Sequence, residues 1–125
     1  VYKRQECTVD ETTGEELTPL AHSSSRRVFA EQTAEKLQEL LAGVVAEGTG
    51  RQAAPSEGTA AGKTGTAQTG QFRDGEELKN YWFAGFYPAE KPRWTIVVMQ
   101  DAQTEPEVSS AAIFARLCDA LSAGE

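Results

Sequence analysis

Residues 59–68 read TAAGKTGTAQ, a strand-like segment with Lys63-Thr64-Gly65-Thr66 at its centre. Glycine normally destabilises the interior of a strand, so its presence here needs an explanation. A strand at the edge of a cleft would present the Lys63 ammonium, two threonine hydroxyls and backbone N–H groups to an extended ligand. Gly65 would let the backbone of that ligand approach. A surface turn of small polar residues is the alternative that these four residues leave open.

Two further strands and two helices are predicted around this segment. Residues 80–88 and 94–100 are rich in aromatic and β-branched residues and predict strands joined by a hairpin-length connection. Apolar residues recur at helical spacing over 33–47, which predicts an amphipathic helix ending at Gly48-Thr49-Gly50. A last helix is predicted over 109–122. This order predicts an α+β fold, an antiparallel sheet with flanking helices.

Apolar faces are predicted on both helices. In the first helix the face comprises Ala34, Leu37, Leu40, Leu41, Val44 and Val45. In the last helix, Ser110, Phe114, Leu117 and Leu121 step along one face, flanked by Ala111, Ala115 and Cys118. Residues 51–58 are predicted to form a loop, and residues 8–10 and 16–18 are predicted to pair as a short hairpin.

Composition narrows the classes of function. The chain has 125 residues, 39% of them hydrophobic, and a formal net charge of −7. This length predicts one domain, and the acidic balance argues against a nucleic-acid partner. The cysteines, Cys7 and Cys118, match no metal or redox spacing, and a disulfide between them stays open. His22, the single histidine, is interpreted as a surface residue.

The strand segments and their flanks resemble the penicillin-binding transpeptidases, most closely the monofunctional class B members. The resemblance is carried by Ala61-Gly62-Lys63-Thr64-Gly65-Thr66-Ala67-Gln68, Trp82-Phe83-Ala84-Gly85-Phe86-Tyr87-Pro88, Trp94-Thr95-Ile96-Val97-Val98 and the upstream helix with Gly48-Thr49-Gly50. It extends from Arg27 to Leu121. It implies the DD-peptidase/β-lactamase-like fold, with residues 1–125 forming the C-terminal part of a transpeptidase domain.

The resemblance also implies roles for residues 61–68, the segment around Lys63-Thr64-Gly65 that we call the KTG strand. Lys63, Thr64 and Thr66 would be catalytic, with the Thr66 backbone N–H as the second oxyanion-hole donor. Gly65, Ala67 and Gln68 would contact the substrate. No metal and no organic cofactor is implied.

The implied activity is cross-linking of peptidoglycan stem peptides through an acyl-serine intermediate. The implied partners are the D-Ala-D-Ala stem peptide, β-lactam antibiotics and the rest of the transpeptidase domain, on the extracytoplasmic side of the cell membrane. A D-Ala carboxypeptidase or β-lactamase of the same fold, or a non-catalytic penicillin sensor or scaffold, are the alternatives. A nucleotide-binding P-loop is disfavoured because Glu57 stands where its first glycine is needed.

The chain contains neither Ser-x-x-Lys nor Ser-x-Asn, the family's other two motifs. Without that serine no acyl-enzyme forms, so we expect the 125 residues alone to be inactive and the activity to belong to a longer parent. Val1 to Gln5 correspond to the codons GTG-TAT-AAG-AGA-CAG, which resemble a sequencing-library transposon end. These five residues are therefore expected to be non-native.

Overall fold

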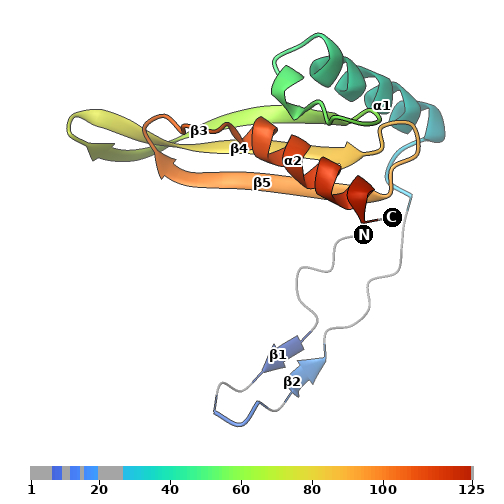
Figure 1. Ribbon diagram of the computed structural model, residues 1–125. Helices are drawn as coiled ribbons and strands as arrows, with labels where there is room; N and C mark the ends of the chain where they lie inside the picture. The colour runs from blue at the N-terminus through green and yellow to red at the C-terminus, as the bar shows by residue number, and fades with distance from the viewer. Residues whose placement is uncertain (1–6, 10–11, 15, 20–26, 125) are drawn as a thin grey trace. The chain divides into compact units, whose positions relative to one another are not determined.

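The computed structural model describes residues 7–9, 12–14, 16–19 and 27–124 (Figure 1). The predictions for residues 1–5 and for His22 fall outside these ranges. The chain divides into two units, Val1–Ala30 and Glu31–Glu125. In the first unit, β1 (Cys7–Val9) pairs antiparallel with β2 (Glu16–Pro19), so the predicted hairpin is present.

The second unit is built on a three-stranded antiparallel sheet. Its strands are β3 (Ala61–Arg73), β4 (Glu76–Tyr87) and β5 (Trp94–Gln103), in the order β3-β4-β5. The helices α1 (Glu31–Ala46) and α2 (Ser110–Ala123) flank this sheet (Figure 1). The prediction of an antiparallel sheet with flanking helices is confirmed, and β3 is an edge strand.

The connection between β3 and β4 is a tight turn. Both strands extend beyond the predicted segments 59–68 and 80–88, as far as the pair Arg73↔Glu76. Asp74 and Gly75 between them have φ of 53° and 85°. Positive φ at both central residues characterises a type I′ turn, for which Asp-Gly is a strong signal. The predicted strands were therefore too short at this end, and Asp74-Gly75 was the missed signal.

Side chains alternate between two faces of the sheet. Directly paired residues share a face. One face therefore carries the paired set Thr64, Phe83 and Val98, and the other carries the paired set Gly65, Trp82 and Met99. Helix α2 crosses the first face (Figure 1). We call these the covered face and the open face.

The core lies between the covered face and α2. The rings of Phe83 and Phe114 are fully buried, with centroids 4.7 Å apart and a 55° interplanar angle. Cys118 is fully buried in the same cluster and is a free thiol. Burial, with a smaller contribution from the Asp119 charge, raises the pKa of the Cys118 thiol to about 11.

Helix α2 begins directly after its N-cap residue, Ser109. The Ser109 side chain accepts a hydrogen bond from the backbone N–H of Ala112 at 3.1 Å, as an N-cap does. The buried face comprises Ser110, Ala111, Phe114, Ala115 and Cys118. Leu117 is 43% exposed, so the predicted face is displaced toward the residues expected to flank it. This displacement of the buried face follows from the contact between the Phe114 and Phe83 rings.

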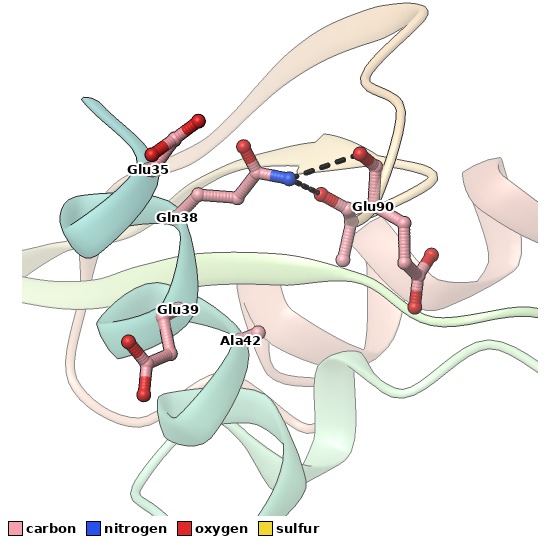
Figure 2. Close-up of a pocket in the computed structure, with 6 residues that line it drawn as sticks. Glu35, Gln38, Glu39, Ala42 and Glu90 are labelled. Atoms are coloured by element: carbon pink, nitrogen blue, oxygen red, sulfur yellow. Dashed lines mark hydrogen bonds between the residues drawn. The ribbon is translucent and has the colours of Figure 1, made fainter. Parts of the chain in front are cut away.

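Helix α1 is anchored mainly near its C-terminal end. Of its predicted apolar face only Val45 is buried, whereas Leu37 and Leu40 are 49% and 59% exposed. Gln38 Nε2 donates to the backbone oxygens of Ala89 and Glu90, at 2.5 and 3.1 Å (Figure 2). These bonds attach α1 to the connection between β4 and β5.

A short 3₁₀ helix, η1 (Arg51–Ala53), begins the segment after α1 that the sequence predicted to be a loop. Within the part of the chain that the structure describes, the helices are too short or too polar to cross a bilayer.

Candidate active site on the edge of β3

The four residues Lys63 to Thr66 lie inside β3, a strand of 13 residues. Among the described residues, β3 pairs with β4 on one side and has no strand partner on the other. An unpaired edge leaves backbone N–H and C=O groups free to bind an extended ligand. A P-loop needs a tight turn into a helix at this position, so the extended strand excludes the nucleotide-binding alternative.

Lys63 and Thr64 are in direct contact. Lys63 Nζ donates to the Thr64 backbone oxygen at 2.7 Å and to Thr64 Oγ1 at 3.2 Å. Thr64 Oγ1 also lies 3.3 Å from the hydroxyl oxygen of Thr49. A cation and two hydroxyls thus converge at one point of the strand. The sequence interpretation did not assign Thr49 to the site.

Two glycines of β3 differ in what the fold requires of them. A Cβ at Gly62 would lie 2.6 Å from Phe83 Cε1 and 2.7 Å from the Ala84 backbone oxygen, closer than real contacts allow. A Cβ at Gly65 would meet only Trp82 Cβ, at an ordinary 3.4 Å. Packing of these residues therefore requires glycine at position 62 and does not require it at position 65.

The remaining predicted site residues continue along the exposed strand. Thr66, Ala67 and Gln68 are all exposed. Gln68 Nε2 donates to Glu77 Oε2 at 2.7 Å, so its amide has a partner within the β3–β4 hairpin. The Thr66 hydroxyl makes no side-chain hydrogen bond within the described ranges, which leaves it available to a ligand.

A cleft between α1 and the β4–β5 connection is lined by residues outside the KTG strand. Its volume is about 260 Å³, and Glu35, Gln38, Glu39 and Glu90 are among its lining residues (Figure 2). A hydrogen bond from the Thr59 hydroxyl is the main cause that lowers the pKa of Glu90. No group of three or more potential metal ligands occurs among the described residues. None of the residues predicted for the site lines this cleft.

Comparison with known proteins identifies the family. Residues 8–119 match the family described as the penicillin binding protein transpeptidase domain. Stage V sporulation protein D of Bacillus subtilis (strain 168) is 35% identical over 96 residues. Penicillin-binding protein PbpB of Mycolicibacterium smegmatis (strain ATCC 700084 / mc(2)155) is 40% identical over 90 residues. These matches take in 74% and 61% of this chain and 15% and 13% of the relatives' length.

A solved structure shows the same fold. The D,D-transpeptidase domain of a peptidoglycan glycosyltransferase from Eggerthella lenta superposes with a TM-score of 0.64 at 28% identity. The match covers 95% of this chain and 27% of that one. This structural likeness and the family match both extend over most of the chain. Together they confirm the resemblance that the KTG strand and its flanking segments carry. The chain belongs to the penicillin-binding protein transpeptidase domain family.

Proposed function

We propose that this chain supplies the KTG-strand wall of the active site in a serine D,D-transpeptidase that cross-links peptidoglycan stem peptides. The serine and its paired lysine would come from a part of the parent protein outside these 125 residues. The chain alone would then be inactive. Its place in this family, together with its likeness to the D,D-transpeptidase domain of a peptidoglycan glycosyltransferase, supports the peptidoglycan substrate.

In the proposed reaction, the serine oxygen attacks the carbonyl carbon of the D-Ala-D-Ala amide and loses its proton to a neighbouring base. The tetrahedral intermediate collapses, the C–N bond breaks, and D-Ala leaves as the protonated amine. An acyl-serine ester remains. The amine of a neighbouring stem peptide then attacks this ester, forms the cross-link and returns the serine hydroxyl.

The residues of β3 bind and orient the substrate in this scheme. The Lys63 ammonium and the hydroxyls of Thr64 and Thr66 bind the terminal carboxylate, because charge-assisted hydrogen bonds to a carboxylate are the stronger kind. The Thr66 backbone N–H stabilises the developing oxyanion together with the serine's own N–H. Ala67 and Gln68 contact the peptide further along the edge.

The observation that carries the proposal is the contrast between Gly62 and Gly65. Packing within the chain accounts for Gly62 but not for Gly65. A side-chain-free position next to an exposed lysine, on an unpaired strand edge, suits a substrate whose backbone pairs with β3. β-Lactams would acylate the same serine, and the domain would act on the extracytoplasmic side of the cell membrane.

Acylation of the full-length protein by a fluorescent penicillin tests the proposal. Loss of a hydrogen bond to a charged group costs about 1.5–3 kcal/mol, so Lys63→Ala should slow acylation by roughly 10- to 100-fold. Lys91→Ala removes an exposed lysine from the β4–β5 connection and should leave the rate unchanged. Equal rates for the wild type and Lys63→Ala would contradict the assigned role.

The products distinguish the proposal from its alternatives. With a D-Ala-D-Ala peptide and an acceptor amine, a transpeptidase forms the cross-linked dimer, whereas a carboxypeptidase forms only the shortened free acid. A β-lactamase releases hydrolysed penicillin in repeated turnovers. A sensor or scaffold gives a stable penicillin adduct, or none, without peptide products.

A further inference from the structure

The Thr64 hydroxyl lies between two other polar groups. The distances to Thr64 Oγ1 are 3.2 Å from Lys63 Nζ and 3.3 Å from Thr49 Oγ1. Lys63 is its neighbour along β3, whereas Thr49 comes from the turn that follows α1. The residue at position 49 is exposed, so burial does not require its hydroxyl to find a partner.

The directions of the protons follow from the chemistry of the three groups. An ammonium has three donors and no acceptor, so Lys63 must donate to Thr64. The Thr64 hydroxyl oxygen accepts from Lys63 with one of its two lone pairs. Its second lone pair and its own proton remain for other partners. If Thr49 donates into that lone pair, the Thr64 proton points elsewhere and can reach a ligand. If Thr64 donates to Thr49 instead, its proton is no longer available for a carboxylate.

The turn that carries Thr49 is fixed by close packing. A Cβ at Gly48 would lie 2.9 Å from the Val44 Cα and backbone oxygen. A Cβ at Gly50 would lie 3.1 Å from Val44 Cγ1 and 3.3 Å from Phe83 Cε2. The backbone N–H of Gly50 also donates to the Val44 oxygen at 3.0 Å. Because Phe83 pairs with Thr64 across the sheet, this packing holds Thr49 at the Thr64 hydroxyl.

We propose that Thr49 is a positioning residue. Its hydroxyl donates to Thr64 Oγ1 and thereby directs the Thr64 proton toward the carboxylate of a D-Ala-ended peptide or a β-lactam. This inference rests on the proposed function. It adds to the carboxylate-binding strand a residue from the turn after α1, which touches the ligand only through Thr64.

The test compares two acylating probes on the full-length protein: a penicillin and its methyl ester, which lacks the negative charge. Thr49→Val keeps the shape of the side chain and removes the donor. One neutral hydrogen bond is worth about 0.5–1.5 kcal/mol, so the penicillin should acylate this variant roughly 2- to 10-fold more slowly. The ester should react at an unchanged rate, and Thr49→Ser should restore the penicillin rate.

A double-mutant cycle distinguishes an effect of Thr49 through Thr64 from a general disturbance of the turn that carries Thr49. In a Thr64→Val background, Thr49→Val should cause no further loss, because its only route to the ligand is already removed. Equal slowing of both probes, additive losses in the cycle, or no slowing of the penicillin would each overturn the inference. In each of these outcomes the wild type still reacts with penicillin, so they contradict the role of Thr49 without contradicting the proposed function. A wild type that does not react would contradict both the role of Thr49 and the proposed function.

Discussion

The covered and open faces of the β3-β4-β5 sheet are both lined by large apolar side chains, yet their environments differ. On the covered face, Phe83 is fully buried against α2. On the open face, Val97 and Met99 are 58% and 45% exposed, and Trp82 is 38% exposed. The covered face therefore supplies the core of the unit Glu31–Glu125. The open face keeps apolar area in contact with solvent and contributes less to the stability of this unit.

The same difference recurs along β3 itself. Gly62 belongs to the covered face and is packed against the Phe83 ring. Gly65 belongs to the open face, where an added Cβ would contact only Trp82 Cβ. Substitutions of buried residues on the covered face should therefore change the free energy of unfolding. Substitutions of exposed residues on the open face should change it less, and Gly65 at the edge of β3 should instead affect reactivity toward a ligand.

The largest effect is expected for Phe114→Ala. Truncation of a fully buried phenylalanine leaves a cavity and costs about 3–5 kcal/mol. Met99→Ala is the matched change on the open face and should cost less than about 1 kcal/mol, since nearly half of its side chain is already exposed. Urea denaturation measures both free energies of unfolding. Similar costs for the two variants would mean that the faces do not differ as described.

A second pair of variants tests the glycines of β3. Gly62→Ala places a methyl group against Phe83 and the Ala84 carbonyl, which should cost about 1–3 kcal/mol of stability. Gly65→Ala should leave stability unchanged or raise it by up to about 1 kcal/mol, because alanine is less flexible than glycine when unfolded. The same variant should slow penicillin acylation. A Gly62→Ala variant as stable as the wild type would contradict the packing role of Gly62. A Gly65→Ala variant acylated at the wild-type rate would contradict the ligand role of Gly65.

Most of the fold could be predicted because its elements carry local signals. Ser109 marks the start of α2, and the β-branched run in Trp94–Gln103 marks β5. Two features needed tertiary information. The face that α2 buries is set by where the Phe114 ring meets Phe83. The exposure of Leu37 and Leu40 depends on how α1 is oriented against the rest of the unit. Periodicity shows that a helix has an apolar face but not what that face touches.

The candidate site was predictable only in part. Lys63 to Thr66 are contiguous in sequence, so their placement on one strand followed from the strand prediction. Thr49 lies 15 residues away from Thr64 in sequence, and no periodicity connects them. The distinction between Gly62 and Gly65 was also inaccessible, because it depends on which face of β3 meets Phe83.

A smaller loss of stability is expected from a substitution at the start of α2, the helix that packs on the covered face of the sheet. Ser109→Ala removes the side-chain acceptor for the Ala112 N–H and should cost about 1 kcal/mol. Ser109→Asp keeps an acceptor at the N-cap and should retain most of the stability. Thermal unfolding of the two variants measures the difference. If the aspartate variant were as unstable as the alanine variant, capping would not explain the role of Ser109.

The smallest effect is expected outside both faces, at Glu90 in the β4–β5 connection. The Thr59 hydroxyl donates to its carboxylate and lowers the pKa of Glu90 below the ordinary value of 4.5. A lowered pKa in the folded state stabilises the protein above pH 4.5, and this contribution is lost as the pH falls below that value. Because the group is largely exposed and screened by solvent, the contribution should be less than about 1 kcal/mol.

Thr59→Val removes this hydrogen bond, so the variant should lose less stability than the wild type between pH 7 and about pH 3. Thr69→Val is the matched control, because the Thr69 hydroxyl donates to the Leu78 backbone oxygen, a group that does not titrate. The control should be weakened equally at both pH values. Urea midpoints at the two pH values give the comparison, and parallel losses for the wild type and Thr59→Val would show that Glu90 does not contribute. A smaller pH-dependent loss for Thr59→Val than for the wild type would mean that the Glu90 carboxylate contributes to stability through its hydrogen bond from Thr59.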